Sequence, residues 1–81
     1  MQKFTDMHGR TIYDGSQIHY TGTFPENMPP ERQIRDGIAL IRNGFLNLAV
    51  IDNNILRGTG LYWELDGEPC YDLIVTEEEL L

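Results

Sequence analysis

The stretch "IRDGIALIRNGFLNLAVI", residues 34–51, decides the fold of this chain. Asn43-Gly44 is the dipeptide preferred in a two-residue type I′ hairpin turn, because both turn positions require positive φ angles. Apolar runs flank this turn, from Ile38 to Ile41 and from Phe45 to Ile51. We therefore predict an antiparallel hairpin at the centre of the fold. The second run is nearly continuous, which is typical of a strand buried on both faces.

Residues 31–42 also fit a helix, because apolar side chains at positions 34, 38 and 41 recur at helical spacing. The internal Gly37 weakens a helix, and the hairpin turn follows directly. We favour a strand, with a bulge or a bend at Gly37.

The rest of the chain alternates short apolar segments with turn signals. In residues 17–21, Ile18 and Tyr20 share one face of a predicted strand, and residues 61–65 alternate in the same way. Gly58 and Gly60 indicate kinks before that second segment, and residues 71–75 form a last short strand. Turns at intervals of about ten residues predict one all-β domain over residues 1–81, a small antiparallel barrel or sandwich. Thr76, with Glu79 three residues later, predicts a short C-terminal helical turn.

Three prolines in residues 23–31 exclude a helix interior or a central strand from this segment. It is therefore a surface loop. The loop carries Phe24 and Met28, and we expect both side chains to be exposed on a backbone stiffened by proline. The alternative is that Phe24 folds back and plugs the end of the barrel.

The net charge of −7 is distributed unevenly. Residues 1–42 carry five basic and five acidic side chains, whereas residues 43–81 carry one basic side chain against eight acidic ones. This acidic half repels phosphate backbones, so we do not expect general nucleic-acid binding. It either attracts a basic surface on a partner or simply keeps a small protein in solution.

The single cysteine, Cys70, permits no intrachain disulfide, which fits a reducing compartment. The first ten residues lack the apolar segment of a signal peptide, and no apolar run is long enough to span a bilayer. We expect a cytoplasmic protein without membrane contact.

The stretch "FTDMHGRTIYDGSQIHY", residues 4–20, resembles a segment in the C-terminal region of YopX-like phage proteins. The residues that carry this resemblance are Asp6, Gly9, Ile12, Tyr13, Gly15, Ile18 and Tyr20. Residues 37–48 resemble that family's hairpin around a glycine turn, and residues 71–81 are similar to its ending. Two departures are Ser16, where the family has Asp, and the loop 23–31, which is particular to this chain.

This resemblance implies an SH3-like β-barrel, here of five or six strands, and a phage or prophage source. It implies a location in the cytoplasm of a bacterial host and no catalytic residues. The opening motif also has a purely structural explanation. Asp6 with Gly9 closes one turn, Ile12 and Tyr13 form a short pairing segment, and Asp14-Gly15 turns the chain into the next strand.

The residues that carry chemistry are few. His8, His19, Cys70 and Asp72 show none of the local spacings that preorganise a metal site, so we expect no metal and no cofactor. Cys70 fits a small buried apolar residue better than a nucleophile. We do not expect an enzyme.

The aromatic side chains suggest binding, since Tyr and Trp dominate the hot spots of protein interfaces. They also serve as core residues, and the sequence leaves both roles open. The candidate protein-binding residues are Phe24, Met28, Tyr13, Tyr20, Tyr62 and Trp63. We expect a non-catalytic interaction module that binds a host protein, for example as an inhibitor of a defence or regulatory factor. A homo-oligomer is a further option. The alternatives are a nucleic-acid-binding barrel, which needs a groove lined by Arg32, Arg35 and Arg42, and a small enzyme.

Overall fold

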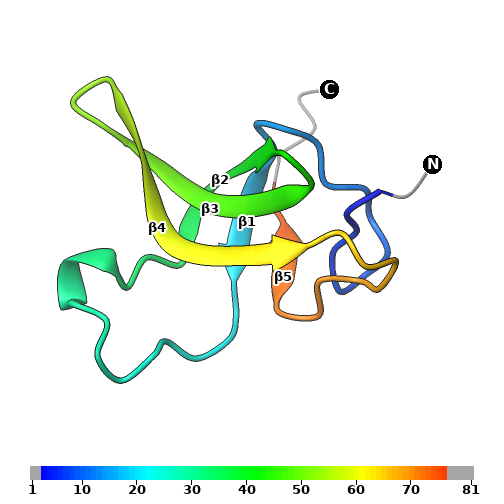
Figure 1. The fold of residues 1–81 in the computed structure, drawn as a ribbon, viewed down its shortest axis with the longest axis horizontal. Helices are drawn as coiled ribbons and strands as arrows, with labels where there is room; N and C mark the ends of the chain where they lie inside the picture. The colour runs from blue at the N-terminus through cyan, green and yellow to red at the C-terminus, as the bar shows by residue number, and fades with distance from the viewer. Residues whose placement is uncertain (1–2, 77–81) are drawn as a thin grey trace.

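The computed structural model describes residues 3–76. These residues form five strands and one 3-10 turn: β1 (Gln17–Tyr20), η1 (Pro30–Arg32), β2 (Asp36–Arg42), β3 (Phe45–Asp52), β4 (Ile55–Glu64) and β5 (Leu73–Val75). The strands make one antiparallel sheet in the order β4-β3-β2-β1-β5 (Figure 1). The prediction of an all-β antiparallel fold of five or six strands is confirmed, with five strands, as is the strand in the second half of residues 31–42. The predicted helical turn after Thr76 lies outside the described residues.

Two tight hairpins connect the three longest strands. Asn43 and Gly44 have φ angles of 53° and 80°, as the type I′ turn requires, and they join Arg42 to its partner Phe45. The turn between β3 and β4 is formed by Asn53 and Asn54, whose φ angles are 52° and 65°. Asparagine tolerates this left-handed conformation better than other residues with a side chain.

The sheet curls around its core but stays open. Its edge strands are β4 and β5, and no hydrogen-bonded ladder joins them in the described part of the chain. One side-chain hydrogen bond links the two ends instead, from Trp63 Nε1 on β4 to Asp72 Oδ1 just before β5, over 2.9 Å. The barrel expected from the sequence is therefore an open, curled sheet.

A bulge bends β4 in its middle (Figure 1). Asn47 pairs with Tyr62, whereas Ala49 pairs with Gly58, so three residues of β4 face one residue of β3. Gly60 has a φ of 96° within this insertion. The buried hydroxyl of Thr59 donates to the Leu48 carbonyl over 2.9 Å and so supplies a partner where the ladder is interrupted. The kink predicted from the glycines is confirmed.

The core lies on one side of the curled sheet. Ile18 and Tyr20 of β1 point into it, as their alternation predicts. The buried cluster is formed by Phe4, Ile12, Ile18, Tyr20, Ala39, Leu46, Leu48, Cys70 and Leu73.

The prediction that residues 45–51 are buried on both faces is wrong. Leu46 and Leu48 are fully buried, but Phe45 is 39% and Ile51 is 66% exposed. The sheet has a single packed layer, so its outer face stays in contact with solvent along most of β3. Ala49 is the exception, because the backbone of β2 lies against it at Gly37. A Cβ atom at Gly37 would lie 2.3 Å from the Ala49 carbonyl oxygen, so Gly37 permits this close approach.

The N-terminal turn covers the free edge of β5. The Met7 N–H donates to the Leu73 carbonyl over 3.0 Å, and the Val75 N–H donates to Asp6 Oδ2 over 2.9 Å. As predicted, Asp6 and Gly9 close this turn, since the Gly9 N–H donates to the Asp6 carbonyl over 3.0 Å. The opening motif therefore completes the sheet at one edge.

Asp6 is fully buried, yet its carboxylate has three backbone donors. The other oxygen, Oδ1, accepts the N–H groups of His8 at 2.9 Å and Arg10 at 2.8 Å. Burial alone raises the pKa of this carboxyl. The hydrogen bonds from Val75, Arg10 and His8, with the charge of His8, outweigh burial and bring the pKa below its ordinary value. Asp6 is therefore held as an anion in the interior.

Candidate functional site

One group of side chains stands out on the solvent side of the sheet, opposite the core. We call it the outer-face patch. Directly opposed residues on neighbouring strands share a face of the sheet. The register opposes Phe45 to both Arg42 and Glu64, and it opposes Asn47 to Tyr62. These five residues line one shallow hollow where the β2–β3 turn meets the end of β4.

The centre of the outer-face patch is an aromatic pair. The rings of Phe45 and Tyr62 meet edge to face, with centroids 5.7 Å apart and an angle of 74° between their planes. Tyr62 is 61% exposed. Edge-to-face contacts of this kind are favourable, so the two rings hold each other in place while they remain accessible.

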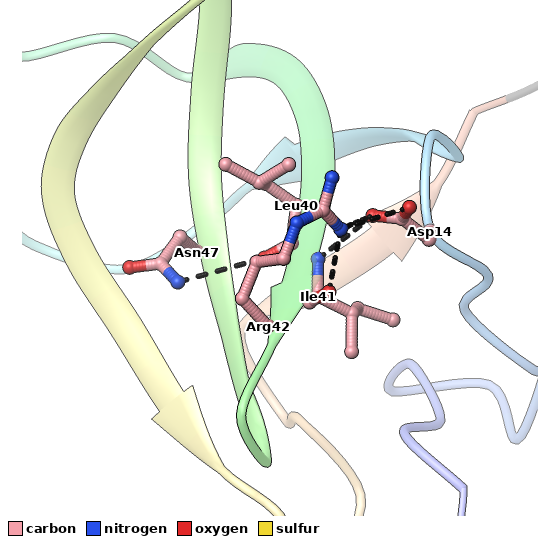
Figure 2. A network of polar contacts seen from close by, with 5 residues as sticks. All are labelled: Asp14, Leu40, Ile41, Arg42 and Asn47. Carbon is pink, nitrogen blue, oxygen red and sulfur yellow. Dashed lines mark hydrogen bonds and ion pairs between the residues drawn. The ribbon is translucent and has the colours of Figure 1, made fainter.

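Arg42 borders the aromatic pair and is held by Asp14 (Figure 2). Its Nη1 atom lies 3.0 Å from both carboxylate oxygens of Asp14, and it donates to the Ile41 carbonyl over 2.7 Å. The Ile41 N–H also donates to Asp14 Oδ1 over 2.9 Å. This backbone hydrogen bond makes the largest contribution to lowering the pKa of the Asp14 carboxyl, and the hydrogen bond from Arg42 makes the next largest. An exposed ion pair adds little to stability. The effect of these contacts is to hold the Arg42 guanidinium in one position beside the aromatic pair.

The remaining members of the outer-face patch are polar. Asn47 Nδ2 lies 3.5 Å from the carbonyl of Leu40, its partner on β2, so its amide is directed toward β2 (Figure 2). Glu64 is exposed at the end of β4. The patch therefore offers a cation, an anion, an amide and two aromatic rings within one hollow.

Three of the six predicted binding residues lie together at the core. Tyr20 contacts Phe24 and Trp63 edge to face, with centroid distances of 5.3 and 5.8 Å. Tyr20 is buried, and its hydroxyl donates to the Thr23 carbonyl. Phe24 was expected to be exposed, but it folds back onto Tyr20 and is half-buried. The Arg35 guanidinium lies 4.9 Å from the centre of the Phe24 ring. These three rings seal one end of the core.

The other three predicted residues lie apart from that cluster. Tyr62 belongs to the outer-face patch, and Tyr13 is exposed in the turn before β1. Met28 is half-buried, with its methyl group close to Gly60 in the β4 bulge. The sequence reasoning missed Phe45, Asn47 and Glu64 as members of a site, and it considered Arg42 only for a nucleic-acid groove. Strict alternation from the Asn43-Gly44 turn would have placed Phe45 on the face opposite Leu46.

The residues considered for catalysis or metal binding are not among those of the outer-face patch. Cys70 is buried, which together with the charges of Asp72, Asp66 and Asp6 raises its pKa to about 11 and keeps the thiol protonated at neutral pH. His19 Nδ1 lies 2.7 Å from Asp36 Oδ1. In residues 3–76, no three His, Cys, Asp or Glu side chains are grouped to hold a metal ion.

The three arginines required for a nucleic-acid groove do not come together. Arg32 lines a hollow with Arg57 and Val50, whereas Arg42 lines the hollow of the outer-face patch. Arg35 donates to the carbonyls of Tyr20 and Gly22, over 3.0 Å in each case. The three arginines therefore do not line one common hollow.

The part of the chain that the structure describes contains no helix of the length and apolarity needed to cross a bilayer. The resemblance to YopX-like proteins stays a prediction, because it rests on the quoted residues alone. No protein-family model, curated protein or solved structure matches this chain.

Proposed function

We propose that this chain is a non-catalytic interaction module that binds a partner protein through the outer-face patch. The observation that carries the proposal is the exposed Phe45–Tyr62 pair beside an arginine held by Asp14. Tyrosine and arginine are enriched among residues that dominate binding energy, and rigid side chains lose little entropy on docking. The phage or prophage origin, the bacterial cytoplasm and a host protein as partner belong to this proposal through the family resemblance.

The composition of the outer-face patch also favours a protein as the ligand. Protein interfaces combine aromatic centres with a polar rim, and here Arg42, Asn47 and Glu64 surround the two rings. Both signs of charge are present, so a partner that offers an acidic and a basic group finds a complement. A polyanion meets Glu64 in the same hollow as Arg42, which disfavours nucleic acid at this site.

The test compares two exposed tyrosines. Tyr62→Ser removes the centre of the outer-face patch, and Tyr71→Ser is a matched control, because Tyr71 is 66% exposed but lies just before β5. The immobilised chain, in wild-type and both variant forms, is incubated with bacterial host lysate, and the captured proteins are quantified by mass spectrometry. Thermal unfolding verifies that all three chains are folded.

We expect one host protein to be retained by wild type and by Tyr71→Ser, and to be reduced about tenfold or more by Tyr62→Ser. Equal capture by both variants would contradict the assignment of the outer-face patch. Salt-sensitive binding of random single-stranded oligonucleotides, with no captured protein, would favour the nucleic-acid alternative instead.

A further inference from the structure

The far end of the β3–β4 hairpin is a second surface, separate from the outer-face patch. β2 pairs with β3 only up to the pair Ile38–Ala49. Beyond this point β3 and β4 continue as a two-stranded ribbon that projects from the sheet (Figure 1). We call residues 50–57 the tip ribbon. A ribbon of two strands has little packing of its own and is marginally stable in isolation.

The tip ribbon exposes three large aliphatic side chains. Ile51 is 66%, Ile55 is 62% and Leu56 is 44% exposed, and every residue from 51 to 58 is accessible. Single exposed apolar residues are ordinary, but Ile51 and Leu56 are direct ladder partners and expose their side chains side by side on one face, whereas Ile55 lies on the other face.

The tip ribbon also has a free backbone edge, because β4 is the last strand of the sheet. In a two-residue hairpin, the residues that flank the turn exchange hydrogen bonds with each other, here Asp52 and Ile55. Alternation along the strand then directs the N–H and C=O of Leu56 away from β3, toward the free edge. Natural edge strands are often blunted by charged side chains, proline, a bulge or a covering loop. In β4, Arg57 and the bulge after Gly58 limit the open stretch to residues 55 and 56, which carry apolar side chains.

The charge of the tip ribbon is balanced. Its only ionic residues are Asp52 and Arg57, and Arg57 Nη2 lies 3.1 Å from Asp52 Oδ2. All the net negative charge of residues 43–81 therefore lies outside this ribbon. Two copies that meet at their tips bring neutral surfaces together and keep their acidic parts apart, which lowers their mutual repulsion.

We propose that the occupant of this edge is a second copy of the chain, paired antiparallel through β4 about a twofold axis at Leu56. In this register Leu56 faces Leu56 of the partner subunit, and Ile55 faces Arg57 of the partner subunit. An isologous contact of this kind closes on itself and ends at a dimer. The proposal does not rest on the function assigned to the outer-face patch.

The register brings together the apolar side chains on one face of the tip ribbon. Ile51 and Leu56 are direct partners in the β3–β4 ladder, so they share one face. Pairing at Leu56 extends this face into a row of four aliphatic side chains across a four-stranded sheet, with Ile51 at both ends. The contact is small compared with the roughly 800 Å² per partner of a standard interface, so the dimer is weak.

The first test is a disulfide cross-link. In the proposed register the two Cα atoms of residue 56 are about 5.5 Å apart, within reach of a disulfide, whereas those of residue 51 are about 14 Å apart. Cys70 is buried, so a new surface cysteine is the reactive thiol. Under mild oxidation, Leu56→Cys should form covalent dimer at least about tenfold faster than Ile51→Cys, which lies on the same face.

The second test is sedimentation velocity from about 10 μM to about 1 mM. Wild type should show reversible dimer formation, and Leu56→Lys should raise the dissociation constant about tenfold or more. Tyr71→Lys, an exposed control elsewhere, should leave it unchanged. A wild-type chain that is monomeric throughout would overturn the proposal and leave the edge to another partner. Equal cross-linking rates for Leu56→Cys and Ile51→Cys would overturn the register and the dimer with it.

Discussion

The two edges of the sheet end in different ways. At β5, the N-terminal turn supplies partners for the free backbone groups, with Met7 bonded to the Leu73 carbonyl and Asp6 bonded to the Val75 N–H. At the far half of β4, in residues 55–58, no comparable segment covers the edge in the described structure. An uncovered edge is a template for another strand, so the difference indicates where this chain can recruit one.

The covered edge shows what the opening motif contributes. Asp6 lies 69 positions before Val75, so a carboxylate near the start of the chain completes the last strand of the sheet. The same side chain organises its own turn through His8 and Arg10. One buried anion therefore ties a local turn to a distant strand, and the tip ribbon contains no such group.

The largest expected effect separates the interior of β3 from the tip ribbon. Leu48 is fully buried, and Leu48→Ala should reduce the free energy of unfolding by about 3 kcal/mol through lost burial and a cavity. Ile51, three residues later on the same strand, is exposed, and Ile51→Ala should cost less than about 0.5 kcal/mol. Urea denaturation of dilute protein measures both. Similar losses of unfolding free energy for Leu48→Ala and Ile51→Ala would contradict the contrast between the buried interior of β3 and the exposed tip ribbon.

The next effect concerns the covered edge. Asp6→Ala leaves the N–H groups of His8, Arg10 and Val75 without their acceptor and should cost about 2 to 3 kcal/mol. Asp6→Asn retains one carbonyl oxygen and should lose less. Chemical denaturation at pH 7 gives both values. A loss below about 0.5 kcal/mol for Asp6→Ala would show that the edge does not depend on this carboxylate.

A smaller effect appears on acidification. Because the pKa of Asp6 is lower in the folded chain than its ordinary value of 3.8, the carboxylate stabilises the fold above that pH. This contribution is lost as the pH falls through the folded-state pKa. The stability difference between wild type and Asp6→Asn should therefore shrink from pH 7 to about pH 2. A difference that stays constant over this range would contradict the ionised state.

Local patterns predicted much of the fold. The Asn43-Gly44 turn, the alternation around Ile18 and the kink at Gly60 each depend on the conformational preferences of a few adjacent residues. The turn closed by Asp6 and Gly9 is equally local. Short-range signals of this kind fix where strands begin, bend and end, which is why five or six strands were expected.

Contacts between distant residues escaped the sequence reasoning. An apolar run does not reveal whether anything covers its second face, so Phe45 and Ile51 were assigned to the interior. The proline-containing loop was expected to expose Phe24, but the ring packs onto Tyr20, as in the alternative that Phe24 folds back. The outer-face patch depends on the β3–β4 register, which the bulge sets, and so only the exposed Tyr62 was identified in advance.

Hydrogen exchange at two backbone amides tests the difference between the edges most directly. In a dilute sample, where the chain is monomeric, the Val75 N–H should be strongly protected by its hydrogen bond to buried Asp6. The Leu56 N–H, directed to the free edge, should exchange close to the rate of an unstructured peptide. NMR-detected exchange resolves both amides in one experiment. Fast exchange at Val75, or strong protection at Leu56 in the monomer, would contradict a covered edge at β5 and an open one at β4.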